Sequence, residues 1–277
     1  AKQEPRVEAE PVPGEPGVVL LRTWMRDRPF IVDTVQETLR QAGARIRRLL
    51  HPIFVVERDA AGAVRAISGP GEFGQRESVL HVEAEGASDV AALVDRLRAN
   101  LTQVIWATDD YGAMRNKAEE IADELRSGSL PRPWSADVDE FAAFLDWLGQ
   151  KNFVFLGYRE YEFRGQGSER IAQVRRGSGL GILRREESSH YFQPRPLPED
   201  LRRRLSEPPL WLVSKTNAES PIHRRAHMDY IGIKQVDHNG IVIGERRFLG
   251  LFTARAYAQE PMSIPLLRLK LAHILEA

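Results

Sequence analysis

The sequence predicts an α+β protein made of two modules, each built on an antiparallel sheet. In the first half, the segments follow one another as strand, helix, strands and helix, which is the order of a ferredoxin-like unit. In the second half, short alternating strands joined by turns outnumber the helices. The chain has 277 residues, of which 42% are apolar and 28% charged, so it has the length and composition of two globular domains.

The elements of the first module follow from hydrophobic periodicity. Residues 18–25 form a short apolar strand, and Pro29 suits the first turn of the helix that follows. Strands are expected over 46–58 and 79–85, and residues 90–105 repeat apolar side chains at helical spacing. We therefore expect a βαββα unit with an antiparallel sheet.

The second module is predicted to be mostly antiparallel sheet with flanking helices. Asp237–Gly240 has the composition of a hairpin turn. A helix begins near Ile264 and is expected to be truncated by the end of the chain. Strands are expected over 153–163, 210–215, 230–237 and 241–253.

The domain limits are drawn from changes in composition. Residues 1–17 are rich in Pro, Glu and Gly and are expected to be a disordered lead-in. The first domain is placed at 18–130, with an extra helix over 111–126, because a Ser-Gly-Ser stretch and two prolines follow that helix. The second domain is placed at 131–277.

Charge and composition exclude several classes of partner and site. Lysine plus arginine equals aspartate plus glutamate at 39 each, so no net field favours nucleic acid or an anionic membrane. Paired arginines such as Arg246-Arg247 lie among acids and are interpreted as solvated surface or interdomain ion pairs. The chain has no cysteine, which excludes disulfides and thiolate metal sites. No apolar run approaches the ~20 residues of a membrane span, and a cytoplasmic location is expected.

Two motifs resemble ligand sites but have better structural explanations. The glycines of Gly177–Gly181 alternate too closely for a dinucleotide fingerprint, and a tight turn with positive φ is the preferred interpretation. His223 and His227 have i, i+4 spacing, but no glutamate lies between them. A third ligand would have to come from Asp229 or His238, so structural or surface histidines are preferred. No catalytic, cofactor-binding or metal-binding residue is assigned.

The turn Asp27-Arg28-Pro29-Phe30 is the candidate effector site. It lies between the first strand and the first helix, where unpaired backbone N–H groups and the positive end of the helix dipole suit a carboxylate. Asp27 would accept a hydrogen bond from a ligand's ammonium, or it would cap the helix. This turn resembles the Asp-Arg-Pro-Gly hallmark of ACT domains, which sense small molecules in many amino-acid enzymes. Phe30 stands here in place of the usual glycine.

A more specific resemblance covers the chain from about residue 18 to its end. Its blocks are similar to the N-terminal region of the large bacterial NAD-dependent glutamate dehydrogenases. These blocks, in chain order, are Arg28–Val35, His51–Ile53, Glu77-Ser78 with His81–Glu83, Asn152–Tyr161, Gly179–Leu183, His223-Arg224, Met228–Lys234, and Gly244–Thr253 with Ala256-Tyr257.

The resemblance implies an ACT-type first domain followed by a second, PAS-like α+β module. It implies a parent enzyme of glutamate catabolism that converts L-glutamate and NAD to 2-oxoglutarate, ammonium and NADH, with NAD bound in a downstream catalytic domain. This segment would then serve allosteric regulation and homo-oligomer assembly. Its partners would be the remainder of the same chain, a second copy and a free amino acid. The alternative is a purely structural segment that packs subunits and binds no small molecule.

Overall fold

The computed structural model describes residues 4–69 and 74–275. By its internal contacts the chain divides into two compact units, Ala1–Thr108 with Ser220–Arg225, and Asp109–Glu219 with Ala226–Ala277. None of the described helices combines the length and apolar composition of a membrane span.

The first unit has a single antiparallel sheet with the strand order β1-β2-β6-β4-β5, and β3 also pairs with β6. Because β3 and β4 pair with opposite ends of β6, they act as one strand interrupted at His51-Pro52. The strands are β1 (Arg6–Pro11), β2 (Val18–Arg26), β3 (Arg45–Leu50), β4 (Ile53–Arg58), β5 (Val64–Ser68) and β6 (Gln75–Glu85).

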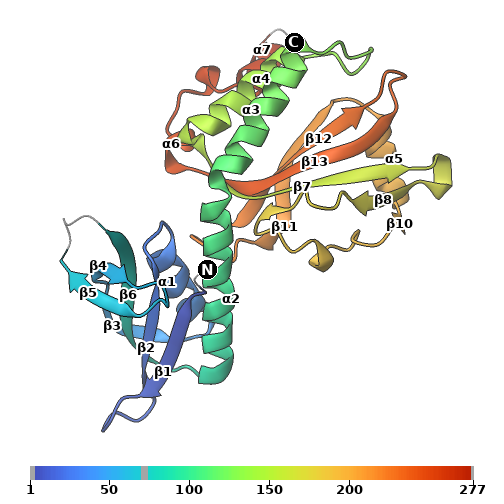
Figure 1. The fold of residues 1–277 in the computed structure, drawn as a ribbon. Helices are drawn as coiled ribbons and strands as arrows, with labels where there is room; N and C mark the ends of the chain where they lie inside the picture. Colours follow the sequence, from blue (N-terminus) through green and yellow to red (C-terminus); the bar gives the residue numbers. More distant parts are fainter. Residues whose placement is uncertain (1–3, 70–73, 276–277) are drawn as a thin grey trace. The chain divides into compact units, whose positions relative to one another are not determined.

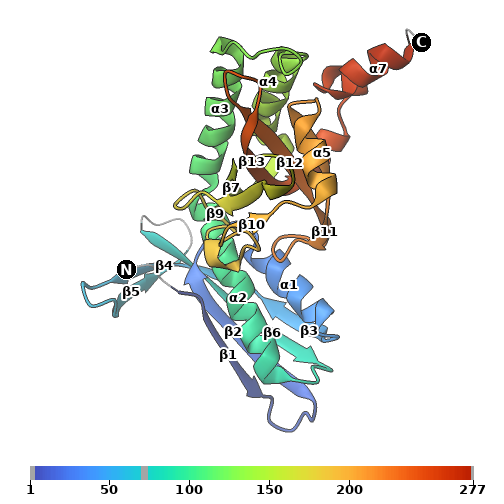
Figure 2. The same cartoon turned by 90° about the vertical axis from the view of Figure 1, so that its right-hand side faces the viewer.

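Two helices, α1 (Ile31–Gln41) and α2 (Val90–Asp109), cover the sheet of the first unit (Figures 1 and 2). They lie side by side, because the Asn100 amide of α2 donates to the Thr38 hydroxyl of α1 at 3.0 Å. Leu39 and Leu97, one on each helix, are fully buried. The α+β class and the ferredoxin-like order predicted from the sequence are confirmed.

The start of the chain differs from expectation. Residues 1–17 were expected to be disordered, but Arg6–Pro11 forms β1, an edge strand paired in register with β2. Its alternation explains the pairing, because Val7 is buried while Arg6 and Glu8 face solvent. Residues 1–3 of the expected lead-in lie outside the described residues.

The second unit has an antiparallel sheet with the order β10-β8-β7-β13-β12-β11, to which β9 adds by pairing with β7. The hairpin predicted at Asp237–Gly240 joins β12 to β13, and Gly240 has the positive φ of 81° that such a turn requires. The strands are β7 (Phe153–Arg164), β8 (Ile171–Val174), β9 (Leu180–Gly181), β10 (Arg195–Pro196), β11 (Trp211–Glu219), β12 (His227–Val236) and β13 (Val242–Phe252).

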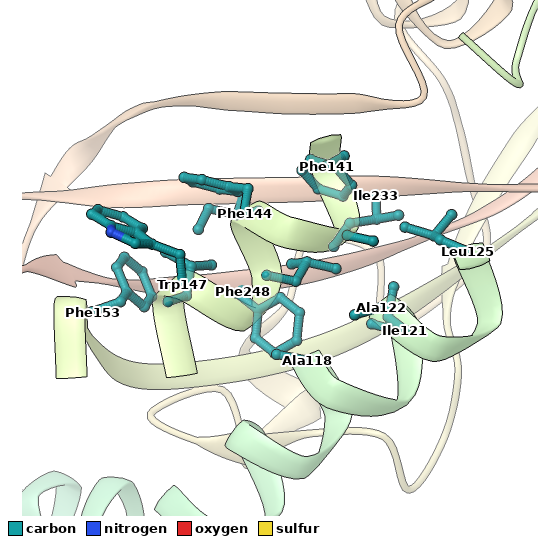
Figure 3. Packing of buried hydrophobic residues seen from close by; sticks show 14 of the residues in the cluster. Ala118, Ile121, Ala122, Leu125, Phe141, Phe144, Trp147, Phe153, Ile233 and Phe248 are labelled. Carbon is teal, nitrogen blue, oxygen red and sulfur yellow. The ribbon is translucent and has the colours of Figure 1, made fainter. Parts of the chain in front are cut away.

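Helices cover both faces of this second sheet. α3 (Tyr111–Ser127) and α4 (Val138–Trp147) pack on one face over an aromatic core (Figure 3). Phe141 of α4 stacks on Trp211 of β11 with 4.7 Å between ring centroids. α5 (Glu199–Ser206) packs on a smaller apolar cluster, and the short helices α6 (Ala254–Tyr257) and α7 (Leu267–Leu275) follow β13.

Helix α3 packs on α4 and β7 within the second unit. The sequence placed this helix in the first domain, on the proline-rich stretch that follows it. The domain limits 18–130 and 131–277 stay a prediction, and the contacts place the division of the structure at Thr108 and Asp109.

Candidate effector site

The turn Asp27–Phe30 leaves β2 and opens α1, as the sequence predicted. The backbone N–H of Asp27 donates to the Arg76 carbonyl at 2.9 Å, and its carboxylate lies 3.2 Å from the Arg76 guanidinium. Asp27 therefore pairs with a residue of the neighbouring strand, and the N-cap residue of α1 is Phe30 rather than Asp27.

Arg28 attaches the turn to α2. Its guanidinium donates to the Thr108 hydroxyl at 2.8 Å and to the Ile105 carbonyl at 3.3 Å. A cation beside the carbonyls of a helix's last turn is also favoured by the helix dipole. Pro29 is exposed and makes the turn that precedes the helix. The first three residues of the motif thus hold the turn in place by contacts within the first unit.

Phe30 is the N-cap residue of α1 and has a left-handed backbone, with φ 74°. That conformation costs a side-chain-bearing residue about 1–2 kcal/mol relative to glycine. It explains why glycine is usual at this position of the ACT hallmark. Phe30 keeps the conformation while its ring packs against the ring of His223, with 4.6 Å between centroids.

His223 comes from the distant segment Ser220–Arg225, which belongs to the first unit by its contacts. Its backbone N–H donates to the Thr34 hydroxyl at 3.0 Å, and its Nδ1 lies 3.0 Å from the Asp33 carboxylate. Ser220 and Ile222 beside it are each 2% exposed. The first turns of α1 are therefore contacted by the chain's own histidine, at the place where the sequence suggested an amino-acid ligand.

Sequence reasoning did not connect His223 with this turn. The i, i+4 spacing of His223 and His227 suggested one helix face, although structural or surface histidines were preferred. His223 lies in a bend with φ 66°, and His227 begins strand β12. No cluster of metal-ligating side chains occurs within residues 4–69 and 74–275. The one available signal was the charge of Asp33 in the first helical turn, which does not identify a partner 190 residues away.

In the second unit, a side chain of the same chain likewise occupies the anion-binding loop Gly177–Gly181. Gly177 and Gly181 have positive φ of 80° and 59°, which confirms the predicted tight turn. The backbone N–H groups of Gly177 and Gly179 donate to the two carboxylate oxygens of Glu186 at 3.1 and 2.8 Å. The loop thus binds an anion, and that anion is a side chain of the same unit.

Arg246 and Arg247, interpreted from the sequence as solvated surface or interdomain ion pairs, both pair with acids. Because neighbours on a strand point to opposite faces, the two guanidiniums separate. Arg246 pairs with Glu124 of α3, and Arg247 donates to Glu245 at 2.9 Å and to the Tyr161 hydroxyl at 3.1 Å. Both pairs lie inside the second unit.

Comparison with known proteins agrees with this geometry. The family model for the ACT1 domain of glutamate dehydrogenase matches residues 16–101, which contain the turn, α1 and the first part of α2. The chain is 34% identical over 259 residues to the NAD-specific glutamate dehydrogenase of Halomonas elongata, covering 90% of this chain. The chain is therefore similar to a segment of the NAD-specific glutamate dehydrogenases.

Two further members of the NAD-specific glutamate dehydrogenase family match less closely. The protein of Pseudomonas aeruginosa is 30% identical over 90% of this chain, and that of Mycobacterium tuberculosis is 25% identical over 85%. The chain spans only 16% of the Halomonas and Pseudomonas proteins and 14% of the mycobacterial one. The family resemblance stated from the sequence, including its ACT-type domain, is confirmed, and the chain corresponds to a small part of these proteins.

Proposed function

We propose that this chain is a non-catalytic regulatory and assembly segment of an NAD-specific glutamate dehydrogenase. The parent enzyme would oxidise L-glutamate with NAD to 2-oxoglutarate and ammonium, in the cytoplasm. NAD and the catalytic residues would belong to the remainder of the same chain. The match to the ACT1 domain of glutamate dehydrogenase supports this proposal.

The observation that carries the regulatory proposal is the position of His223 on the first turns of α1. A free amino acid at Asp27–Phe30 would place its carboxylate near the same N–H groups and dipole end. It would compete with the contacts of His223 to Asp33 and Thr34. Effector binding would then release Ser220–Arg225, which precedes strand β12 and so connects the turn to the second sheet.

Calorimetry with the twenty amino acids tests this competition. The variant His223→Ala removes the ring and its bond to Asp33, so we expect it to bind the effector about tenfold more tightly than the wild type. His238→Ala, on the hairpin of the second unit, is the matched control and should leave affinity unchanged. If neither protein binds any amino acid at about 10 mM, the effector site at Asp27–Phe30 is wrong.

The second candidate is a purely structural segment, and a specific observation favours it. Asp27 is paired with Arg76, Arg28 donates to α2, and Phe30 packs on His223, so the polar groups of the turn already have partners. In that case the segment would pack subunits or hold the remainder of the chain. Light scattering tests the self-association that assembly requires. A monomer at about 100 µM would remove the claim that this chain assembles on its own.

A further inference from the structure

A pocket of about 350 Å³ lies on the second sheet, on the face opposite α3 and α4. It is bounded by α5, the Glu207–Pro209 turn, β11, β12 and one residue of β13. Ile233 and Phe248 belong to the aromatic core, so alternation along the strands directs Lys234 and Glu245 to the pocket face.

Lys234 and Glu245 are direct cross-strand partners in the antiparallel pairing of β12 and β13. Opposite charges in that position ordinarily pair, because their Cβ atoms lie about 5 Å apart. Here the side chains turn apart, and they form no ion pair with each other in the described part of the chain. The Lys234 ammonium donates to the Arg204 carbonyl at 2.8 Å and to the Glu207 carbonyl.

Glu245 turns the other way and uses only one of its oxygens. The Tyr230 hydroxyl donates to Oε1 at 2.6 Å, and Arg247 donates to Oε1 at 2.9 and 3.2 Å. Oε2 accepts from no residue within 4–69 and 74–275, although Glu245 is 6% exposed and lines the pocket. An open acceptor therefore borders the cavity.

The opposite side of the pocket offers donors. The Lys234 ammonium has three N–H groups, of which two reach the carbonyls described above. Arg204 also lines the pocket, and its guanidinium pairs with no carboxylate among the described residues. The other charged residues that line the pocket are Glu207 and Lys215. Lys215 is paired with Asp229 at 2.7 Å, and Glu207 is exposed, so solvent ions screen its charge.

Apolar side chains line a further part of the pocket. Leu201 and Leu205 come from α5, and Leu212 comes from β11. A ligand matched to this lining has a positive group for Glu245, a negative group for Lys234 and Arg204, and a short apolar part. A pocket of this volume holds a small molecule only.

We propose that this pocket binds a free α-amino acid with an apolar side chain, its carboxylate held by Lys234 and Arg204 and its ammonium by Glu245. The ligand bridges two cross-strand charges that the fold holds apart. Burial lowers the pKa of Lys234 to about 8, and a carboxylate beside the ammonium raises that pKa again. The site lies in the second unit and is independent of the turn Asp27–Phe30.

The test is calorimetric titration of the 277-residue chain with L-leucine, L-methionine and L-phenylalanine. Two matched probes separate the charges: 4-methylpentanoate is leucine without its ammonium, and 3-methylbutylamine is leucine without its carboxylate. We expect millimolar or tighter binding of at least one amino acid, and at least about tenfold weaker binding of both leucine analogues than of L-leucine. No saturable binding of any amino acid at about 10 mM, or equal binding of an analogue, overturns the proposal.

Variants assign the binding to this pocket. Ser214 lines the pocket opposite Tyr230 on the edge strand β11, so Ser214→Phe fills the cavity and leaves the charges intact. Ser214→Phe and Lys234→Met should each weaken binding at least about tenfold, while Lys117→Met, an exposed lysine of α3, should not. Binding that Ser214→Phe leaves unchanged contradicts the proposal. Binding that instead changes with His223→Ala takes place at the turn Asp27–Phe30. The two proposed sites can therefore be tested separately.

Discussion

In each of the two sheets an arginine donates hydrogen bonds to a buried glutamate. The two glutamates differ in how many of their carboxylate oxygens accept hydrogen bonds. Glu77 of the first sheet is fully buried, and Arg58 donates to both of its oxygens at 2.7 Å. Trp24 adds a donor to Oε2 and Gln75 a donor to Oε1. Glu245 of the second sheet receives all its donors on Oε1.

The arginines do not explain this difference, because the side chains of Arg58 and Arg247 are both 26% exposed. The difference comes from the surroundings of the two carboxylates. Glu77 is closed off between β2 and β4, whereas Glu245 borders a pocket. A carboxylate with both oxygens satisfied holds a sheet together, and one with a free oxygen beside a cavity is available to a ligand. The predictions below test that distinction.

The largest expected effect comes from changing each carboxylate to its amide. Glu77→Gln places an NH₂ group against donors on either oxygen and leaves Arg58 unpaired, which should cost about 3–5 kcal/mol of unfolding free energy. Glu245→Gln also removes the charge that pairs with Arg247. The amide oxygen keeps the hydrogen bonds from Tyr230 and Arg247 while the NH₂ group faces the pocket, so the cost should be smaller, about 1–3 kcal/mol. Urea unfolding of both variants, followed by circular dichroism, measures the difference.

Glu83→Gln is the control for the first sheet, because Glu83 lies on the same strand as Glu77 and its ion pair with Arg48 is exposed. It should change the unfolding free energy by less than about 1 kcal/mol. Equal losses of unfolding free energy from Glu77→Gln and Glu245→Gln would mean that the free oxygen of Glu245 does not reduce what this carboxylate contributes to stability.

A smaller effect is expected from Tyr230→Phe. The Tyr230 hydroxyl donates to Glu245 at 2.6 Å, and burial, with the charge of Glu245, raises its pKa so that it stays a donor. Removing a bond to a charged group costs about 1.5–3 kcal/mol. Because Arg247 still holds Oε1, we expect the lower end of that range by urea unfolding. A loss as large as that of Glu77→Gln would show that Tyr230 is the main support of the carboxylate.

Local sequence signals predicted much of the fold. The turn Asp237–Gly240 identified the hairpin, and the helical repeat over 90–105 identified α2. β1 was missed because Arg6–Pro11 alternates short and charged residues, and its strand conformation comes from pairing with β2 rather than from its own hydrophobicity. Edge strands with few apolar residues give no local signal.

The candidate sites show the same limit. The Asp27–Phe30 turn could be located from the sequence because it is local, between a strand and a helix. The His223 contact could not, because the packing of a distant segment depends on the completed fold. The opposition of Lys234 and Glu245 lies between these cases. Counting back from the hairpin turn pairs Lys234 with Gly244, and only the register shift between Gln235 and Val236 makes Glu245 its partner, which the local sequence does not show.

The smallest predicted effect is a pH dependence that belongs to Lys234. Burial lowers its pKa from 10.5 to about 8, with Arg204 also lowering it. Between these values the unfolded chain holds a proton that the folded chain has lost, so the unfolding free energy rises with pH across that window. Below pH 8 both states are protonated and this contribution to the slope vanishes. The side chain is half-exposed, so solvent screening limits the gain to about 1 kcal/mol.

Urea unfolding from about pH 7 to about pH 10, compared between the wild type and Lys234→Met, isolates this term because the other lysines are common to both proteins. The wild type should gain about 1 kcal/mol relative to the variant as the pH rises, and Lys117→Met should follow the wild type. A saturating amino acid in the pocket should flatten the slope, because its carboxylate returns the pKa of Lys234 toward 10.5. A slope that persists under saturating ligand would mean that the ligand's carboxylate does not lie beside Lys234. The difference between Glu77 and Glu245 would then be a difference in their contributions to stability and not in ligand binding.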